Sequence, residues 1–225
     1  MADAKFQDAF DFYPNAAGAL AKAVAFRSIA IQAVDSNERI VGAVCAYYSL
    51  LHLAISLMYV LPDKIEPKIA DKLRAKRGRG EKDPSRLISH ADAIGFVRKC
   101  CEEGGLDKVF VEEIDDAKEL REFVNYRPEI TIHDGQAYFG PCDRDLQPDS
   151  VDKLVAKLDG IFRSVLGWAQ TKAAAKGTFL KDALSLSPSL FQREEPFYDR
   201  WCSRASVDSA MSFLNELDSM LKTVG

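Results

Sequence analysis

Apolar side chains recur along most of the chain with the three- and four-residue spacing of amphipathic helices. The stretch before Pro14 is rich in aromatic residues and predicts a short helix or arm. Between residues 130 and 139 the spacing changes to alternation around Asp134 and Gly135, which predicts a small β-hairpin. The helical pattern, interrupted at prolines and glycines, predicts helices over residues 16–34, 40–61, 84–103, 109–126, 149–176 and 207–224.

We therefore expect an all-α fold, an antiparallel up-down bundle of about five to seven helices with a hairpin insertion at about 129–140. A length of 225 residues suits one well-buried domain. Residues 1–176 are predicted to form the bundle, and residues 177–225 a C-terminal helical extension packed on the same domain. The apolar fraction of 47% and the charged fraction of 28% are ordinary for a soluble globular protein.

The segment 40–61 runs for 22 residues without a fixed charge, which is long enough to cross a bilayer. It also carries Tyr47, His52 and Ser56, polar side chains that neighbouring helices satisfy better than lipid does. We interpret it as the central helix of the bundle and expect no membrane association.

Five cysteines are present, an odd number without CxxC spacing near histidine. No metal site and no cofactor are therefore expected. The N-terminus does not look like a signal peptide, so we expect reduced thiols used for packing and a cytoplasmic location. The cysteines are Cys45, Cys100, Cys101, Cys142 and Cys202.

The most informative residue is Arg121, because it falls on the apolar stripe of the helix 109–126 among Phe110, Ile114 and Ala117. A guanidinium is too costly to bury unless it meets a carboxylate, an anionic ligand or a water-lined cleft. Asn125 lies one turn later, beside Arg121. The pair therefore predicts a polar site that faces the core or an interface.

The net charge of −4 argues against a protein that binds nucleic acid over its whole surface. One segment differs: residues 71–86 hold seven Lys or Arg against three Asp or Glu. Lys76, Arg77 and Arg79 in this segment are candidates for contact with an RNA backbone. The alternative is a solvated loop between helices, since the segment lacks the GxxxxGK[ST] pattern of a phosphate-binding loop.

Three sequence pieces occur in order: a Tyr-Tyr-x-x-x-His run, a later helix that opens with His, and an Arg-x-x-x-Asn-Tyr ending. They are Tyr47, Tyr48 and His52, then His90, then Arg121, Asn125 and Tyr126. In this order they resemble the HEPN domain family, and the resemblance covers roughly residues 16–176.

The resemblance implies a helical bundle that dimerises, with a cleft at the dimer interface lined by the Arg121 motif. Many HEPN proteins are metal-independent endoribonucleases of toxin or defence systems, some paired with a nucleotidyltransferase-type antitoxin. They use an Arg, a polar neighbour and a His four to six residues beyond the Arg. Here the polar neighbour would be Glu122, and Tyr126, Arg127 and Pro128 stand where that His is expected.

Arg127 and His133 have a literal Arg-x5-His spacing, but Pro128 and the alternating residues after it break the helix that would bring the two together. His133 is more simply a hairpin residue. The candidate catalytic residues are thus Arg121, Tyr126 and His133. The candidate nucleotide- or RNA-binding residues are Arg121, Asn125, Arg127, Arg98, His90, Lys76, Arg77 and Arg79.

Several of these residues have a structural alternative. His52 stands one turn from Tyr48, where a polar pair in the core is favoured over catalysis. His90 shares a face with Ile94, which favours a packing role, although it is within reach of Arg121 across a bundle. Arg98 is either a second cation of the same site or an ordinary interhelical ion pair.

Three functions remain open. The leading hypothesis is a non-catalytic or weakly catalytic HEPN-like homodimer that binds nucleotide, RNA or a protein partner. The second is an active endoribonuclease with a rearranged site that uses His90 or His133. The third is a purely structural interaction module in which Arg121 pairs internally with Asp92 or Asp115.

Overall fold

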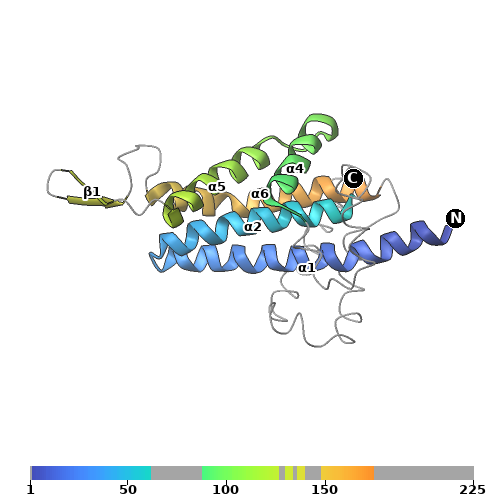
Figure 1. Ribbon diagram of the computed structural model, residues 1–225, viewed down its shortest axis with the longest axis horizontal. Helices are drawn as coiled ribbons and strands as arrows, with labels where there is room; N and C mark the ends of the chain where they lie inside the picture. Colours follow the sequence, from blue (N-terminus) through green and yellow to red (C-terminus); the bar gives the residue numbers. More distant parts are fainter. Residues whose placement is uncertain (1, 62–87, 127–129, 134–135, 140–147, 175–225) are drawn as a thin grey trace, which may run out of the picture.

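The computed structural model describes residues 2–61, 88–126, 130–133, 136–139 and 148–174 (Figure 1). The described residues contain five helices packed as a bundle, which confirms the predicted all-helical fold. The helices are α1 (Ala2–Asp35), α2 (Arg39–Val60), α4 (His90–Gly104), α5 (Val109–Tyr126) and α6 (Pro148–Ala174). The basic segment 71–86, the residues from 175 onward and the predicted helix 207–224 lie outside the described residues.

Helices α1 and α2 form a long antiparallel pair joined by a tight turn (Figure 1). Asn37 occupies the left-handed region at φ 64°, and its N–H donates to the carbonyl of Val34 at 2.9 Å. Asparagine tolerates this conformation better than most residues, which explains why α1 ends here. The prediction that α1 starts at residue 16 was wrong, because the helix begins at Ala2 and continues through Pro14. A proline removes one backbone hydrogen bond, which weakens a helix without always ending it.

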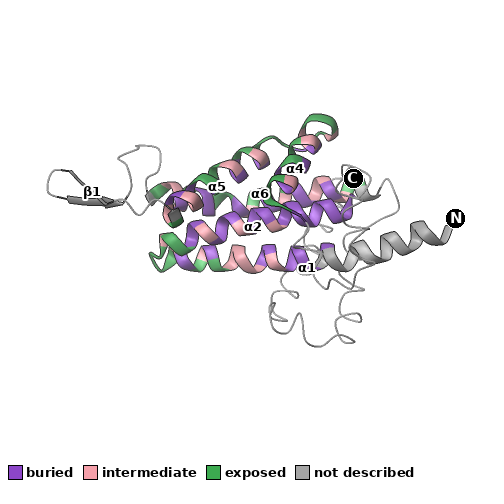
Figure 2. Ribbon diagram, viewed as in Figure 1, coloured by how far each residue is buried: buried purple, intermediate pink, exposed green. Residues whose placement is uncertain are grey.

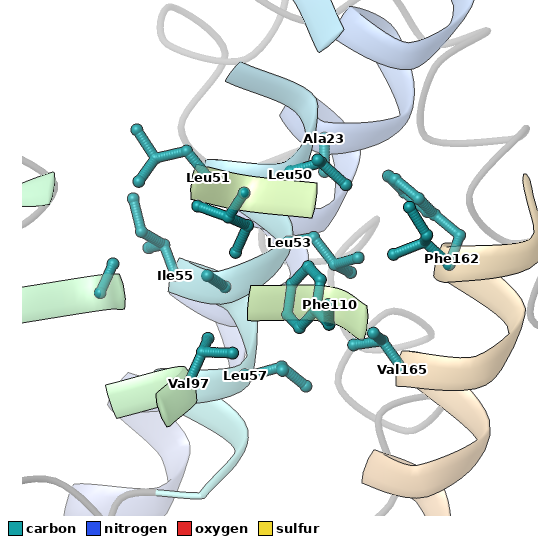
Figure 3. Packing of buried hydrophobic residues seen from close by; sticks show 14 of the residues in the cluster. Ala23, Leu50, Leu51, Leu53, Ile55, Leu57, Val97, Phe110, Phe162 and Val165 are labelled. Carbon is teal, nitrogen blue, oxygen red and sulfur yellow. The ribbon is translucent and has the colours of Figure 1, made fainter. Parts of the chain in front are cut away.

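Helix α2 is the centre of the bundle, since it contacts each of the other four described helices. It is buried along most of its length (Figure 2). Figure 3 shows Leu53 of α2, Phe110 of α5 and Phe162 of α6 gathered in the core. The buried hydroxyl of Ser56 donates to the carbonyl of Ala16 on α1 at 3.0 Å. Helix α1 therefore satisfies this polar group of α2, whereas the buried hydroxyl of Ser49 has no hydrogen-bond partner among the described residues.

By length and composition alone, α2 is the one helix among the described residues that could cross a membrane. In the most apolar part of this helix, 72% of the residues are buried inside the bundle. The core helix of a folded bundle has the same composition, so this observation is weak evidence for a membrane span.

Helix α4 begins later than predicted. Ser89 is its N-cap: the Ser89 hydroxyl accepts from the Asp92 N–H at 3.1 Å, and the Ser89 N–H donates to the Asp92 carboxylate at 3.0 Å. This reciprocal capping box satisfies the backbone N–H groups of both Ser89 and Asp92 and fixes the start of the helix. The prediction of a start at residue 84 was wrong, and one consequence is that His90 stands at the first position of α4.

Helix α6 has a polar contact with each of the other four described helices. Asp159 pairs with Arg27 of α1, and Asp152 accepts from Arg39 of α2 at 2.9 Å. Lys157 pairs with the buried Glu113 of α5 at 2.5 Å. The indole N–H of Trp168 donates to the carbonyl of Gly104, the last residue of α4, at 3.0 Å. These contacts lie around an apolar face that includes Leu158, Phe162 and Val165.

Two short strands, β1 (Ile130–His133) and β2 (Gln136–Phe139), pair antiparallel beyond the end of α5 (Figure 1). The register places Ile130 opposite Phe139 and His133 opposite Gln136. The two residues between the strands lie outside the described residues, so the Asp134-Gly135 turn stays a prediction.

Gly42 on α2 lies where three helices pack closely together. A Cβ atom added there would lie 3.1 Å from Cγ2 of Val34 on α1 and 3.3 Å from Cγ1 of Val151 on α6. We expect Gly42→Val to lower the free energy of unfolding by about 1–3 kcal/mol, because a valine overpacks this contact. Denaturant unfolding followed by circular dichroism measures the change. Gly95→Val is the matched control, since nothing lies within 4 Å of a Cβ at Gly95. Equal stability of the two variants would contradict the close approach.

Candidate functional site

Four side chains from three helices meet on one side of α2. Tyr47 and Tyr48 come from α2, His90 from the first position of α4, and Arg121 from the fourth turn of α5. We call these four residues the Arg121 cluster. All three sequence pieces that carry the family resemblance contribute to it.

Arg121 lies over both tyrosine rings. Its guanidinium carbon is 5.4 Å from the ring centroid of Tyr47 and 5.7 Å from that of Tyr48. These distances are those of cation–π contacts, in which the electron-rich ring face attracts the charge. The residue is half-buried, and its Nε atom is buried. The helical pattern thus correctly indicated that Arg121 faces inward.

Tyr47 and His90 are joined by a hydrogen bond of 2.8 Å between the Tyr47 hydroxyl and Nδ1 of His90. The Tyr47 side chain is fully buried, with 0% of its surface exposed. Burial is the largest cause that raises the pKa of Tyr47 to about 12, and the Arg121 charge opposes this rise. Tyr47 therefore keeps its proton at neutral pH.

His90 is exposed as a residue, yet its ring packs against Tyr47 and Tyr48, with centroid distances of 5.7 and 6.2 Å. This partial burial, followed by the charges of Arg121 and Lys118, lowers the pKa of His90. The ring is therefore neutral at pH 7 and offers one N–H donor and one nitrogen lone pair. The predicted packing role of His90 takes the form of these ring contacts at the exposed start of α4.

Beside the cluster, the rings of Phe26, Tyr48 and His52 lie in mutual contact. The His52 ring lies parallel to that of Phe26 on α1, with centroids 5.6 Å apart, and 6.4 Å from that of Tyr48. Burial, followed by the charge of Lys22 and the nearby His90, lowers the pKa of His52 to about 4. His52 is therefore neutral at physiological pH. Its contact with Tyr48 in the described part of the chain is between the two rings, without the hydrogen bond that a polar pair would have.

The lowered pKa of His52 predicts a loss of stability in mild acid. The unfolded chain binds this proton near pH 6.5 and the folded protein only near pH 4, so stability is full above pH 6.5 and falls between these values. For a half-buried ring we expect a loss of about 1–2 kcal/mol. Unfolding measured at pH 7.5 and 5.0 tests this against His52→Gln, which should show a smaller drop. An equal drop in both proteins would contradict the assignment.

Other candidate residues lie elsewhere. Arg98 is exposed and pairs with Asp115 of α5 at 2.7 Å, so it forms the interhelical ion pair that was one of its two interpretations. Asn125 is exposed at the end of α5. The side chains of Tyr126 and His133, and the whole of Arg127, Lys76, Arg77 and Arg79, lie outside the described residues.

The two carboxylates proposed as internal partners of Arg121 have other contacts. Asp92 accepts from the N–H of Ser89 in the capping box, and Asp115 accepts from Arg98. Arg121 lies over two tyrosine rings, and the interpretation of Arg121 as an internal strut stays a hypothesis.

Sequence reasoning missed the parts of the site that are not charged. Tyr47 and Tyr48 supported the resemblance but were not included among the site residues. Phe26 gave no signal, because an aromatic residue on an apolar helix face is ordinary. The adjacent tyrosines one turn before His52 were a usable signal for an aromatic surface.

Among the described residues, no group of three His, Cys, Asp or Glu side chains is arranged to hold a metal ion. Cys45 and Cys101 are free thiols whose pKa values are raised, chiefly by burial. A raised thiol pKa lowers the fraction of reactive thiolate, which agrees with a packing role. Comparison of the chain with models of protein families, curated proteins and solved structures gives no match.

Proposed function

We propose that this protein is a HEPN-like helical protein that binds RNA or a nucleotide through the Arg121 cluster, without catalysis or with weak catalysis. The observation that supports this is the meeting of Arg121, His90 and the two tyrosines from three separate helices. A half-buried guanidinium next to an exposed imidazole combines positive charge with hydrogen-bond donors, and Tyr48 adds a partly exposed aromatic residue. Nucleotides present the complementary phosphates and bases.

Binding is favoured over cleavage because the described cluster offers few acid and base groups. Metal-independent RNA cleavage needs a base for the 2′-hydroxyl, an acid for the leaving 5′-oxygen and cations for the transition state. Arg121 supplies charge and His90 one titrating group. Tyr47, with its pKa of about 12, is a poor acid and a poor base at neutral pH.

The second candidate function is a metal-independent endoribonuclease that uses His90. It is favoured by the neutral imidazole of His90, which is held by Tyr47 and lies near Arg121. The third is a purely structural module, favoured by the packing of Arg121 on two tyrosine rings.

The resemblance carries further expectations that belong to this proposal. They are a homodimer with the cluster at its interface cleft and a nucleotidyltransferase-type antitoxin as partner. The N-terminal sequence and the cysteines add the expectation of a cytoplasmic location. The fold would have five to seven helices with the hairpin as an insertion. A molar mass measured in solution tests the dimer directly.

The three functions are separated by one experiment. Purified protein is incubated with a fluorescein-labelled RNA oligonucleotide in EDTA, and binding is followed by polarisation while cleavage is followed on gels. We expect binding that weakens as salt is raised, as phosphate contacts require, and an intact RNA. Rapid cleavage in EDTA would favour the endoribonuclease. Neither binding nor cleavage would favour the structural module.

A further inference from the structure

The hydroxyl of Tyr47 has a single hydrogen-bond partner among the described residues, and this partner is Nδ1 of His90. Tyr47 is fully buried, so its hydroxyl cannot turn to water. A buried O–H group without an acceptor costs free energy. A phenol oxygen whose lone pairs accept no hydrogen bond costs less. The Tyr47 hydroxyl is therefore the donor and Nδ1 of His90 the acceptor.

An imidazole that accepts at Nδ1 in its neutral form carries its proton on Nε2. We propose that Tyr47 fixes His90 in the tautomer protonated at Nε2, so that His90 presents an N–H donor beside the Arg121 guanidinium to a phosphate oxygen. Tyr47 is thus a positioning residue, which acts on the ligand through His90 and does not touch it. Because this inference rests on the proposed function, its ligand is the phosphodiester of RNA or the phosphate of a nucleotide.

The same tyrosine also positions the second donor. The Tyr47 ring lies 5.4 Å from the Arg121 guanidinium carbon, while its hydroxyl holds His90. One buried side chain on α2 therefore links α4 and α5. A phosphate that meets both donors would accept a charge-assisted hydrogen bond from Arg121 on α5 and a hydrogen bond from the neutral His90 on α4. Two donors on different helices would fix its position.

The charged surroundings agree with an anion site. The groups near His90 are Arg121 and Lys118 on α5 and His52 on α2, and the pKa of His52 of about 4 keeps that ring neutral. Glu122 of α5 is the opposing charge near Tyr47, and it is paired with Lys118 at 3.8 Å.

The tautomer is tested in the free protein by long-range ¹H–¹⁵N NMR of the histidine rings, with His90→Gln used for assignment. We expect His90 in the Nε2–H form near pH 7.5. In Tyr47→Phe the neutral ring loses its donor, so the pKa of His90 should rise towards its ordinary value. Tyr48→Phe is the matched control for the tautomer, because no hydrogen bond joins Tyr48 and His90 in the described part. An Nδ1–H form, or a pKa that falls or stays unchanged in Tyr47→Phe, would overturn the inference.

The ligand is tested by polarisation with the labelled RNA oligonucleotide. His90→Ala should weaken binding about 3- to 10-fold, the effect of losing one hydrogen bond of ordinary net strength from a neutral donor. His90→Gln should bind more tightly than His90→Ala, because its amide places an N–H near the position of Nε2. Equal affinities of these two variants would overturn the donor role. RNA binding with the wrong tautomer refutes this inference alone, whereas the correct tautomer without RNA binding refutes the proposed function.

Discussion

Replacing Tyr47 with alanine is expected to lower the free energy of unfolding by about 3–5 kcal/mol, as for other buried aromatic residues. The side chain has 0% of its surface exposed on the central helix. Its loss would leave a cavity between α2, α4 and α5 and would also remove the partner of His90 and one ring under Arg121. Urea unfolding followed by circular dichroism gives the change, provided that the dependence on urea keeps its slope.

Two control variants are needed. One separates the contribution of the Tyr47 ring to stability from that of its hydroxyl, and the other measures the effect of shortening an exposed apolar side chain. Tyr47→Phe keeps the ring and should cost only about 1 kcal/mol, the net contribution of one hydrogen bond. Val109→Ala shortens an apolar side chain that is 44% exposed, so its cost should stay below about 0.5 kcal/mol. If Tyr47→Ala were as mild as Val109→Ala, the packing described around the Arg121 cluster would be wrong.

The largest expected effect on function is that of Arg121→Ala, which should weaken RNA binding about 10- to 100-fold. This range corresponds to the loss of one charged hydrogen-bonding group at a phosphate. It should also make the slope of log affinity against log salt concentration shallower, by the amount that about one phosphate contact contributes. Polarisation with the labelled oligonucleotide at several salt concentrations measures both quantities, and circular dichroism checks that the variant is folded.

The control for charge is Lys153→Gln, which removes one positive charge from an exposed position on α6. It should change the affinity for RNA less than twofold, which is about 0.4 kcal/mol. Arg121→Lys keeps the charge but loses the planar fork that lies over the rings, so an intermediate affinity is expected. Equal effects of Arg121→Ala and Lys153→Gln would show that RNA responds to net charge and not to the Arg121 cluster.

The helices could be predicted from the sequence wherever the apolar spacing was long and its ends were marked. Helix α5 begins and ends at the predicted residues, and α2 is displaced by one residue. The start of α4 was missed because Asp83-Pro84 looked like a strong helix start, while the Ser89 capping box fixes the observed start. For α1, the weight given to Pro14 was too large. Local signals thus predict that a helix exists better than where it begins.

The candidate site was predictable only in part. Arg121 could be found because a charge on an apolar stripe has a cost that is visible in the sequence. The contact between Tyr47 and His90 could not, because 43 positions separate them and the helix packing alone brings them together. Arg98 on α4 was either a cation of the site or part of an ion pair between helices. The deciding fact is its contact with Asp115 on α5, and this depends on how the two helices pack, which the local sequence does not show.

The contacts of α6 have a consequence for how many ways this bundle can be assembled. Apolar faces alone let a helix slide or rotate against its neighbours with little change in buried area. A displacement of α6 by one turn, about 5.4 Å, would separate Asp159 from Arg27, Lys157 from Glu113 and Trp168 from Gly104 together. Because Glu113 is buried, a shifted arrangement would also strand a desolvated carboxylate. Because these contacts are lost together, the polar contacts of α6 disfavour a shifted register of this helix.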